Sequence, residues 1–212
     1  MLLERIGVIT DEVSDHFIEA LDWVCEEGLK IVELRTVDGK NISHLTDNEV
    51  EQLKREVNHR GLIVSAIASP IFKCALDPER SVASGDRFGQ DETSIESHYE
   101  LLKRTMHIAK TLDTRYIRIF SFWREEDPSA YFDEIVQHLT NAAQMAKQAN
   151  LILLLENEGS CNGGLAEEVA ALVKAVNSPH LKALWDPGNE RARGRLPYPD
   201  GYDHLKHLLA HV

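Results

Sequence analysis

Short apolar runs alternate with helical patterns along almost the whole chain, and this alternation constrains the fold more than any other feature. The runs are rich in β-branched residues, as buried parallel strands are. Strands are therefore predicted at residues 6–9, 31–34, 62–68, 116–120, 151–155 and 181–185, with the start of a seventh at 209–212. Right-handed crossovers through the intervening helices would place these strands in one parallel sheet. The predicted fold class is α/β, either a (β/α) barrel or an open doubly wound sheet.

Five helices are predicted between the strands, and the second has the clearest start. Thr46 and Glu49 form a capping box, and Gly61 suits the left-handed end of the helix. The other helices are predicted from about 14 to 28, from 95 to 112, from 127 through 146 and over 165–176. A loop rich in proline, glycine and arginine is expected from Asp186 to 200, followed by a short helical stretch at 202–208.

The ends of the strands favour the barrel over the doubly wound sheet. Polar residues recur at the carboxyl ends of the predicted strands, where barrels place their functional groups. The first strand leads into Thr10-Asp11-Glu12 and not into a glycine-rich loop. Because a dinucleotide fold needs such a loop to cradle phosphates, its main support is missing. The sequence accounts for about six and a half of eight strand–helix units, so the barrel is predicted to be incomplete.

The charge balance and the cysteines limit the classes of function. The chain has 23 basic and 35 acidic residues and a formal charge of −12, which disfavours a general affinity for nucleic acid phosphates. Its 3 cysteines have no metal-like spacing and indicate reduced thiols. No stretch approaches the roughly 20 apolar residues of a membrane span. We expect one compact domain over residues 1–212, cytoplasmic, with neither a nucleic acid nor a membrane as partner.

Two carboxylates stand where two predicted strands end. Glu156 closes the apolar run 151–155, and Asp186 closes the run 181–185. Adjacent strands lie roughly 4.8 Å apart, so carboxylates at matched heights could bind one divalent cation. Oxygen ligands suit Mg²⁺ or Mn²⁺, and an added imidazole would extend the choice to Co²⁺ or Zn²⁺. The alternative is that each charge marks the point where its strand meets water.

Further polar residues could lie at the mouth of the barrel, the end at which the carboxyl ends of the strands meet. Arg118 lies inside an apolar strand, where an unpaired charge is costly, so Glu33 or Glu156 is its expected partner. That ion pair would be either structural or part of a substrate site. Asn189 could reach the same place, although an Asx turn explains it equally well.

The connection over residues 69–94 is long for a loop between a strand and a helix. Loops of this length in compact domains are commonly lids or mobile segments. It contains the basic residues Lys73, Arg80 and Arg87 and the aromatic residue Phe72. A basic lid would suit an anionic or polyhydroxy substrate, but lysines and arginines are also ordinary surface residues.

Four short segments carry a family resemblance in their order and spacing. They are IVELR at 31–35, YIRIF at 116–120, LLEN at 154–157 and LWDPGN at 184–189. With these segments the chain resembles the sugar phosphate isomerase/epimerase family, which has the xylose isomerase-like TIM barrel fold. The resemblance implies that Glu156 and Asp186 are the first two ligands of a divalent metal. His211-Val212 looks like the start of the family's His-Val-His pattern in strand seven, so the chain is expected to be truncated before the third ligand, the next histidine, and to lack the fourth, a glutamate of strand eight.

The resemblance also implies a reaction. The expected enzyme is a metal-dependent isomerase or epimerase of carbohydrate metabolism, acting on a sugar, sugar phosphate or related polyhydroxy ketone by proton transfer through an enediolate. Glu156 would be both a metal ligand and an acid/base group, and the candidate substrate-binding residues are Glu33, Lys73, Arg118 and Asn189. Exposed strand edges in an incomplete barrel predict a homo-oligomer.

The absent ligands support a second hypothesis, a non-catalytic carbohydrate-binding or degenerate barrel. An abasic-site DNA nuclease, which shares the fold, is disfavoured because the chain is acidic and has no histidine cluster.

Overall fold

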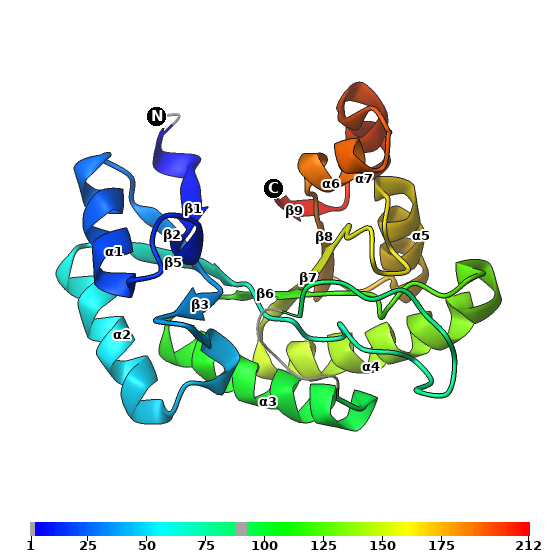
Figure 1. Cartoon of the computed structure of the whole chain (residues 1–212), viewed down its shortest axis with the longest axis horizontal. Helices are drawn as coiled ribbons and strands as arrows, with labels where there is room; N and C mark the ends of the chain where they lie inside the picture. The colour runs from blue at the N-terminus through cyan, green and yellow to red at the C-terminus, as the bar shows by residue number, and fades with distance from the viewer. Residues whose placement is uncertain (1–2, 88–92) are drawn as a thin grey trace. The chain divides into compact units, whose positions relative to one another are not determined.

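The structure, a computed structural model, describes residues 3–87 and 93–212, which form two compact units. The amino-terminal unit holds the residues up to Ser69 together with 103–117. The carboxy-terminal unit holds 70–87, 93–102 and 118–212. Helix α3 (Ile95–Thr111) and strand β6 (Tyr116–Ile119) each contribute residues to both units (Figure 1).

Parallel strands form the sheet of the amino-terminal unit, in the order β1-β2-β5-β6. They are β1 (Gly7–Ile9), β2 (Ile31–Leu34), β5 (Ile63–Ile67) and the first two residues of β6. The same unit contains helices α1 (Phe17–Glu26) and α2 (Asp47–His59), a hairpin of β3 (Thr36–Val37) and β4 (Lys40–Asn41), and 3-10 turns at Leu3–Arg5, Thr10–Glu12 and Ile42–His44.

The start and end of α2 follow from its sequence as predicted. Thr46 Oγ1 accepts a hydrogen bond from Glu49 N–H at 3.3 Å, and the Glu49 carboxylate accepts one from Thr46 N–H at 2.6 Å. Hydrogen bonds to the Glu49 carboxylate, first from Thr46 N–H and then from the Thr46 hydroxyl and Lys40, lower the pKa of Glu49 to about 2. At the other end Gly61 has a φ of +64°, which a residue without Cβ adopts without strain. The capping box is therefore confirmed.

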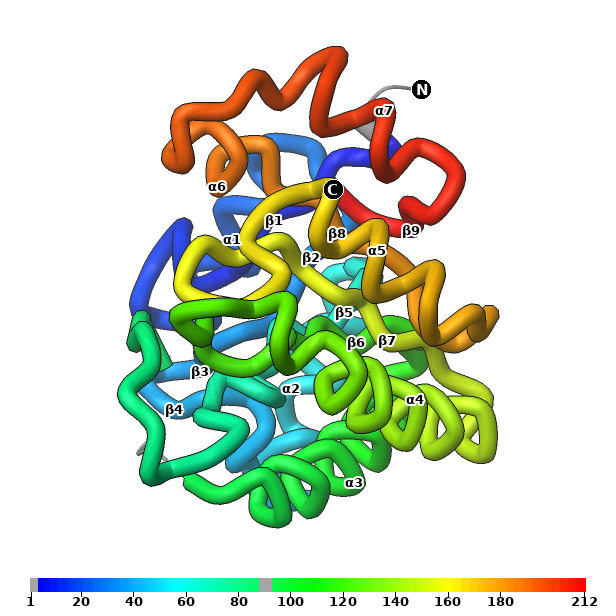
Figure 2. Tube along the Cα trace, turned by 90° about the vertical axis from the view of Figure 1, so that its right-hand side faces the viewer, coloured from blue at the N-terminus to red at the C-terminus, as the bar shows by residue number. Residues whose placement is uncertain are grey.

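The sheet of the carboxy-terminal unit continues from β6 in the order β6-β7-β8-β9. Its further strands are β7 (Ile152–Glu156), β8 (Leu181–Leu184) and β9 (Leu209–His211). The helices are α4 (Phe132–Ala149) after a 3-10 turn at Pro128–Tyr131, α5 (Ala166–Val176), α6 (Pro187–Ala192), and α7 (Tyr202–Leu205) after a π-turn at Pro197–Gly201. Helices α4 and α5 lie side by side and both contact β7 (Figures 1 and 2).

Strand β7 shows why the strands read as unbroken apolar runs. Leu153, Leu154 and Leu155 are all fully buried, so both faces of the strand are covered. A polar side chain on such a strand is tolerated at its end, where the sheet gives way to loops. Glu156, the last residue of β7, occupies that position.

The structure bears out the incomplete (β/α) barrel among the described residues. Strands occur at all seven predicted places, and their bounds differ from the prediction by at most one residue at each end. The segment after Asp186 is the main difference, because α6 replaces the first part of the expected loop. Pro187 lacks an N–H and is suited to the first helical position, while Asp186 caps the helix. The predicted helix at 202–208 ends at Leu205.

Candidate active site

Glu156 and Arg118 form an ion pair at the carboxyl ends of neighbouring strands. Arg118 Nη1 lies 3.2 Å from Glu156 Oε2, and only 5% and 8% of the two side chains are exposed. This confirms one of the two partners predicted for Arg118. Glu156 Oε2 nevertheless accepts no well-aligned hydrogen bond from the described residues. The guanidinium therefore balances the charge of the carboxylate but leaves an acceptor site on this oxygen.

The surroundings of Glu156 shift its proton affinity. Burial raises the pKa of Glu156 to about 7. Arg118 acts against this rise by Coulombic attraction, and Lys73 does so to a smaller extent. The neighbouring carboxylates of Asp186 and Glu158 favour the neutral acid. The result is a carboxyl group that exchanges a proton near neutral pH, as an acid/base group should.

Asp186 lies further along its strand direction than Glu156. The register pairs Glu156 with Leu184, so Asp186 comes two residues after the position opposite Glu156. At about 3.3 Å per residue, this is an offset of roughly 7 Å along an ideal strand. The carboxylates are thus not at the matched heights considered from the sequence. The Oδ1 atom of Asp186 accepts hydrogen bonds from Gly188 N–H at 2.6 Å and Asn189 N–H at 3.0 Å, capping α6.

Asn157 connects these two strand ends. Its side-chain Oδ1 accepts a hydrogen bond from Asp186 N–H at 2.6 Å, and its Nδ2 donates to Asp186 O at 2.9 Å. Asn157 is fully buried.

Asn189 reaches the mouth, as expected. Its side-chain Nδ2 lies 3.4 Å from Glu156 Oε1 and donates to Asn157 O at 2.9 Å. The Asx turn offered as the alternative is present as well, but it is made by Asp186, whose side chain caps the helix that contains Asn189.

Lys73 is buried and is not a surface cation of the predicted basic lid. Its side chain is only 1% exposed, and its Nζ lies 3.3 Å from Glu158 Oε2 and 2.9 Å from Asp86 O. The ammonium also lies 4.4 Å from the centroid of the Phe120 ring, a cation–π contact. Lys73 therefore points inward and is compensated by an acidic and an aromatic side chain.

The rest of the same connection is also tied to the unit. Phe72 is fully buried, and Arg80 pairs with buried Glu125 at 3.0 Å. Arg87 is half-buried. Residues 88–92 of the predicted lid lie outside the described residues. Residues 70–76 of the connection form a packed wall of mostly buried side chains, whereas most of residues 78–86 are exposed, so the lid stays a prediction.

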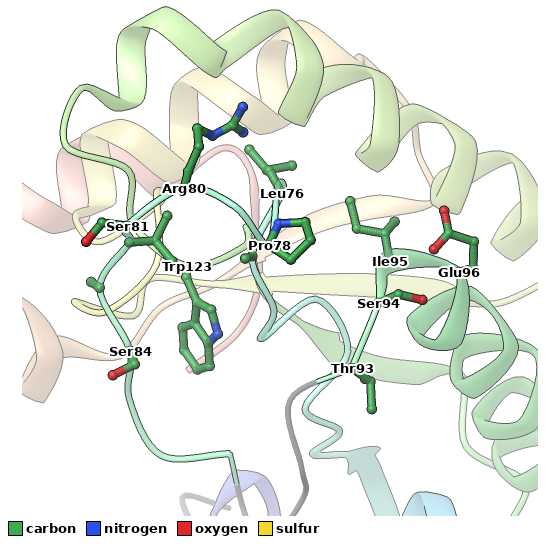
Figure 3. A pocket seen from close by; sticks show the side chains of 13 residues that line it. Leu76, Pro78, Arg80, Ser81, Ser84, Thr93, Ser94, Ile95, Glu96 and Trp123 are labelled. Atoms are coloured by element: carbon green, nitrogen blue, oxygen red, sulfur yellow. The ribbon is translucent and has the colours of Figure 1, made fainter.

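A cavity of about 700 Å³ adjoins this wall (Figure 3). Trp123 lines it and also lies 6.0 Å, ring centroid to Nζ, from Lys73. The remaining lining includes apolar and hydroxyl side chains, such as Leu76, Ser81 and Ser94, and two charged residues, Arg80 and Glu96.

Glu33 belongs to the amino-terminal unit. It lies on β2 opposite Ile9 of β1 and is buried. Its predicted part in substrate binding stays a prediction.

Glu190 is a buried acidic residue that sequence reasoning missed. It is 4% exposed and lies on α6, and its Oε2 accepts a hydrogen bond from Ala166 N–H, the first residue of α5, at 2.9 Å. Asn157 Nδ2 lies 3.5 Å from the same oxygen. Burial raises the pKa of Glu190. The sequence signal available was weak, because Glu190 stands in a segment that looked like a polar loop.

The donor set fits a divalent cation in part. Glu156 offers a buried carboxylate oxygen without an aligned donor, and Asp186 is close enough to influence its pKa. His211 of β9 lies opposite Leu184, which lies opposite Glu156. However, no group of three or more His, Cys, Asp or Glu side chains within ligating range of one point occurs among residues 3–87 and 93–212. Glu156 and Asp186 therefore stay candidate ligands, as the sequence predicts.

Parallel strands alternating with helices, with Glu156 and Asp186 after neighbouring strands, define an α/β protein of the (β/α) barrel class. A family model described as xylose isomerase-like TIM barrel matches residues 21–211. The chain belongs to this family, which confirms the resemblance seen in its sequence. No curated protein matches the sequence significantly.

Solved structures with the same fold include sugar-processing proteins. A probable 3-DHS dehydratase, AsbF from Bacillus anthracis, aligns with 98% of this chain and 71% of its own at a TM-score of 0.74 and 18% identity. A D-psicose 3-epimerase aligns with 97% and 71% at 0.70 and 18%. A xylose isomerase-like TIM barrel protein from Mycobacterium smegmatis, solved in complex with magnesium, aligns with 97% and 72% at 0.72 and 15%. At these identities the likeness shows the fold alone.

None of the helices in the described residues is long and apolar enough to cross a membrane.

Proposed function

We propose that the protein is a divalent-metal-dependent isomerase or epimerase that acts on a sugar, sugar phosphate or related polyhydroxy ketone. The observation that carries the proposal is the buried Glu156 carboxyl, which has a pKa of about 7 and an oxygen without an aligned donor. A group of this kind can take a proton from a carbon next to a carbonyl and return it. The epimerase and the magnesium complex among the similar structures are consistent with this chemistry.

Glu156 and Asp186 would hold the metal, which would polarise the carbonyl and a neighbouring hydroxyl of the substrate. The residues of the chain would do the rest. Arg118, 3.2 Å from Glu156, would keep the carboxylate oriented and favour negative charge on the substrate as the proton leaves. Lys73 would add a second positive charge, and Asn189 would donate to a substrate oxygen near Glu156.

A specific observation favours the alternative of a non-catalytic carbohydrate-binding barrel. Among the described residues, no three His, Cys, Asp or Glu side chains lie together so that they could hold one metal ion. One of the two candidate ligands, Asp186, already caps α6 through Oδ1. A sugar could then bind through hydrogen bonds to the same polar groups without turnover.

Calorimetric titration of Mn²⁺ into the wild type, Glu156→Gln and Asp186→Asn tests the metal site. Both substitutions keep size and remove charge, so they should abolish binding seen in the wild type. Exchange of the proton next to the carbonyl is then followed by NMR on a ketose in deuterated water with Mn²⁺ present. Exchange that is lost in Glu156→Gln supports the enzyme. Binding of the ketose without exchange in a folded, Mn²⁺-loaded protein would favour the alternative.

A further inference from the structure

We propose that Asn157 is a positioning residue that sets the Asp186 carboxylate relative to Glu156, and that Glu190 holds Asn157 in place. This inference rests on the proposed metal site, since it concerns the direction of one of its two ligands. It concerns residues that do not themselves offer a charge to the cation.

Asn157 connects β7 to the residues after β8 at the point where the backbone pairing of the two strands ends. The last residue pair of the β7–β8 register is Glu156 with Leu184. Asn157 then uses its side chain to bond both backbone groups of Asp186, at 2.6 Å from N and 2.9 Å to O. Two bonds from one planar amide, one to the N–H and one to the C=O of the same residue, restrict its backbone more than a single bond would. The backbone of Asp186 is therefore fixed against the residue that follows Glu156.

The fixed backbone determines where the Asp186 side chain points. Its φ is −99° and its ψ is 103°, an extended conformation from which Oδ1 reaches the N–H groups of Gly188 and Asn189. Asn189 in turn donates to Asn157 O at 2.9 Å and lies 3.4 Å from Glu156 Oε1. The hydrogen bonds thus connect Glu156, Asn189, Asp186 and Asn157.

Glu190 supports the amide from behind. Its Oε2 lies 3.5 Å from Asn157 Nδ2, a long contact, and accepts the N–H of Ala166 at 2.9 Å. A buried carboxylate is costly unless donors surround it, and the amino-terminal end of α5 supplies such donors. If Glu190 only capped α5 through Ala166 N–H, the position of its Oε2 3.5 Å from Asn157 Nδ2 would have no explanation. The carboxylate also attracts the Nδ2 side of the amide and so favours the orientation in which Oδ1 faces Asp186 N–H.

The chain contains a matched control for a buried asparagine. Asn162 is 3% exposed, and its amide also bonds several backbone groups, donating to Ser121 O and Trp123 O at 2.9 Å and accepting from Glu125 N–H at 3.0 Å. None of these bonds involves Glu156 or Asp186. Substitution of either asparagine should reduce stability, because buried backbone groups lose partners.

The test compares Asn157→Ala, Asn157→Asp and Asn162→Ala in the full chain by Mn²⁺ calorimetry, thermal unfolding and amide hydrogen exchange. We expect Asn157→Ala to weaken Mn²⁺ binding about tenfold or more, the effect of roughly 1.4 kcal/mol of lost positioning, and to speed exchange at Gly188 and Asn189. Asn157→Asp keeps the acceptor for Asp186 N–H but not the donor, and should be intermediate. Asn162→Ala should be destabilised with wild-type Mn²⁺ affinity and unchanged exchange at these amides.

The outcomes separate this inference from the proposed function. If the wild type does not bind Mn²⁺, the proposed metal site fails, and exchange at Gly188 and Asn189 alone decides the role of Asn157. If Asn157→Asp binds Mn²⁺ like the wild type and protects both amides equally, Asn157 does not position Asp186. Equal effects of Asn157→Ala and Asn162→Ala on affinity and exchange would likewise overturn the inference, since both would act through general stability. If Asn157→Ala does not fold, Asn157→Asp carries the test.

Discussion

The guanidinium of Arg118 and the carboxylate of Glu156 face each other inside the carboxy-terminal unit, 3.2 Å apart and almost fully shielded from water. Charges in such a place interact strongly, but both have lost their hydration. The pair therefore adds little net stability compared with apolar side chains of similar size. Its value is that it keeps a buried carboxylate partly compensated at a strand end.

Replacement of Arg118 by Met should be strongly destabilising. It leaves the Glu156 carboxyl buried without its cation, and removal of one partner of a buried pair typically costs about 3–5 kcal/mol. The double variant Arg118→Met with Glu156→Leu should recover a large part of that loss. Urea unfolding of the wild type, both single variants and the double variant measures the coupling between the two positions. Additive effects would show that the residues do not form an energetically coupled pair.

The pH dependence of stability should carry the signature of Glu156. Burial raises its pKa to about 7 from an ordinary value of 4.5, so between these values the folded state binds more protons than the unfolded state. The contribution of Glu156 is therefore most favourable at acidic pH. It should decline as the pH rises from about 5 to 7 and then level off, by at most about 3–4 kcal/mol for this shift.

Other groups also titrate, so the quantity to measure is the difference in free energy of unfolding between wild type and Glu156→Gln without metal. As the pH increases across that window, the free energy of unfolding of the variant should rise relative to that of the wild type. A constant difference from pH 5 to 8 would contradict the raised pKa.

The capping box of α2 gives a prediction that is independent of the proposed function. Thr46→Ala removes the acceptor for Glu49 N–H and should lower the free energy of unfolding by about 1 kcal/mol, as for other lost N-caps. Thr46→Ser keeps the hydroxyl and serves as the control. Chemical unfolding of both variants measures the effect. Equal stabilities of the Ala and Ser variants would show that the cap contributes nothing.

The three cysteines should differ in reactivity. Cys74 and Cys161 are fully buried, and burial raises the pKa of the Cys161 thiol to about 12, so almost no thiolate forms at neutral pH. Cys25 is half-exposed. In the folded protein an aromatic disulfide reagent should label Cys25 far faster than the other two, and all three should react in urea. Peptide mass spectrometry identifies the site. Rapid labelling of Cys161 in the native state would contradict its burial.

The strands and most helices could be predicted from the sequence because local signals and burial agree there. The apolar run before Glu156 is buried on both faces, so its composition alone indicates a central strand. The same holds for α2, where the capping box and Gly61 mark both ends. The ion pair of Arg118 with Glu156 could be predicted because a charge within an apolar strand needs a partner.

The remaining features depend on register and on contacts distant in sequence. The two-residue offset of Asp186 from Glu156 is a property of strand pairing, which the apolar pattern does not specify. Lys73 was expected on the surface because lysine usually is, and its burial depends on Glu158, 85 positions away. Helix α6 was missed because Pro187 and Gly188 are typical of loops, although proline is also favoured at the start of a helix.

The N-terminal cap of α6 makes the stability of that helix sensitive to a cation bound at Asp186. Both capping bonds end on Oδ1 of Asp186. A cation drawn to this carboxylate would withdraw electron density from the acceptor and weaken its hold on Gly188 and Asn189. A helix of 6 residues has little cooperative reserve against fraying. Binding of a cation at the strand ends could then be detected as faster hydrogen exchange of two backbone amides, even under conditions in which no reaction takes place.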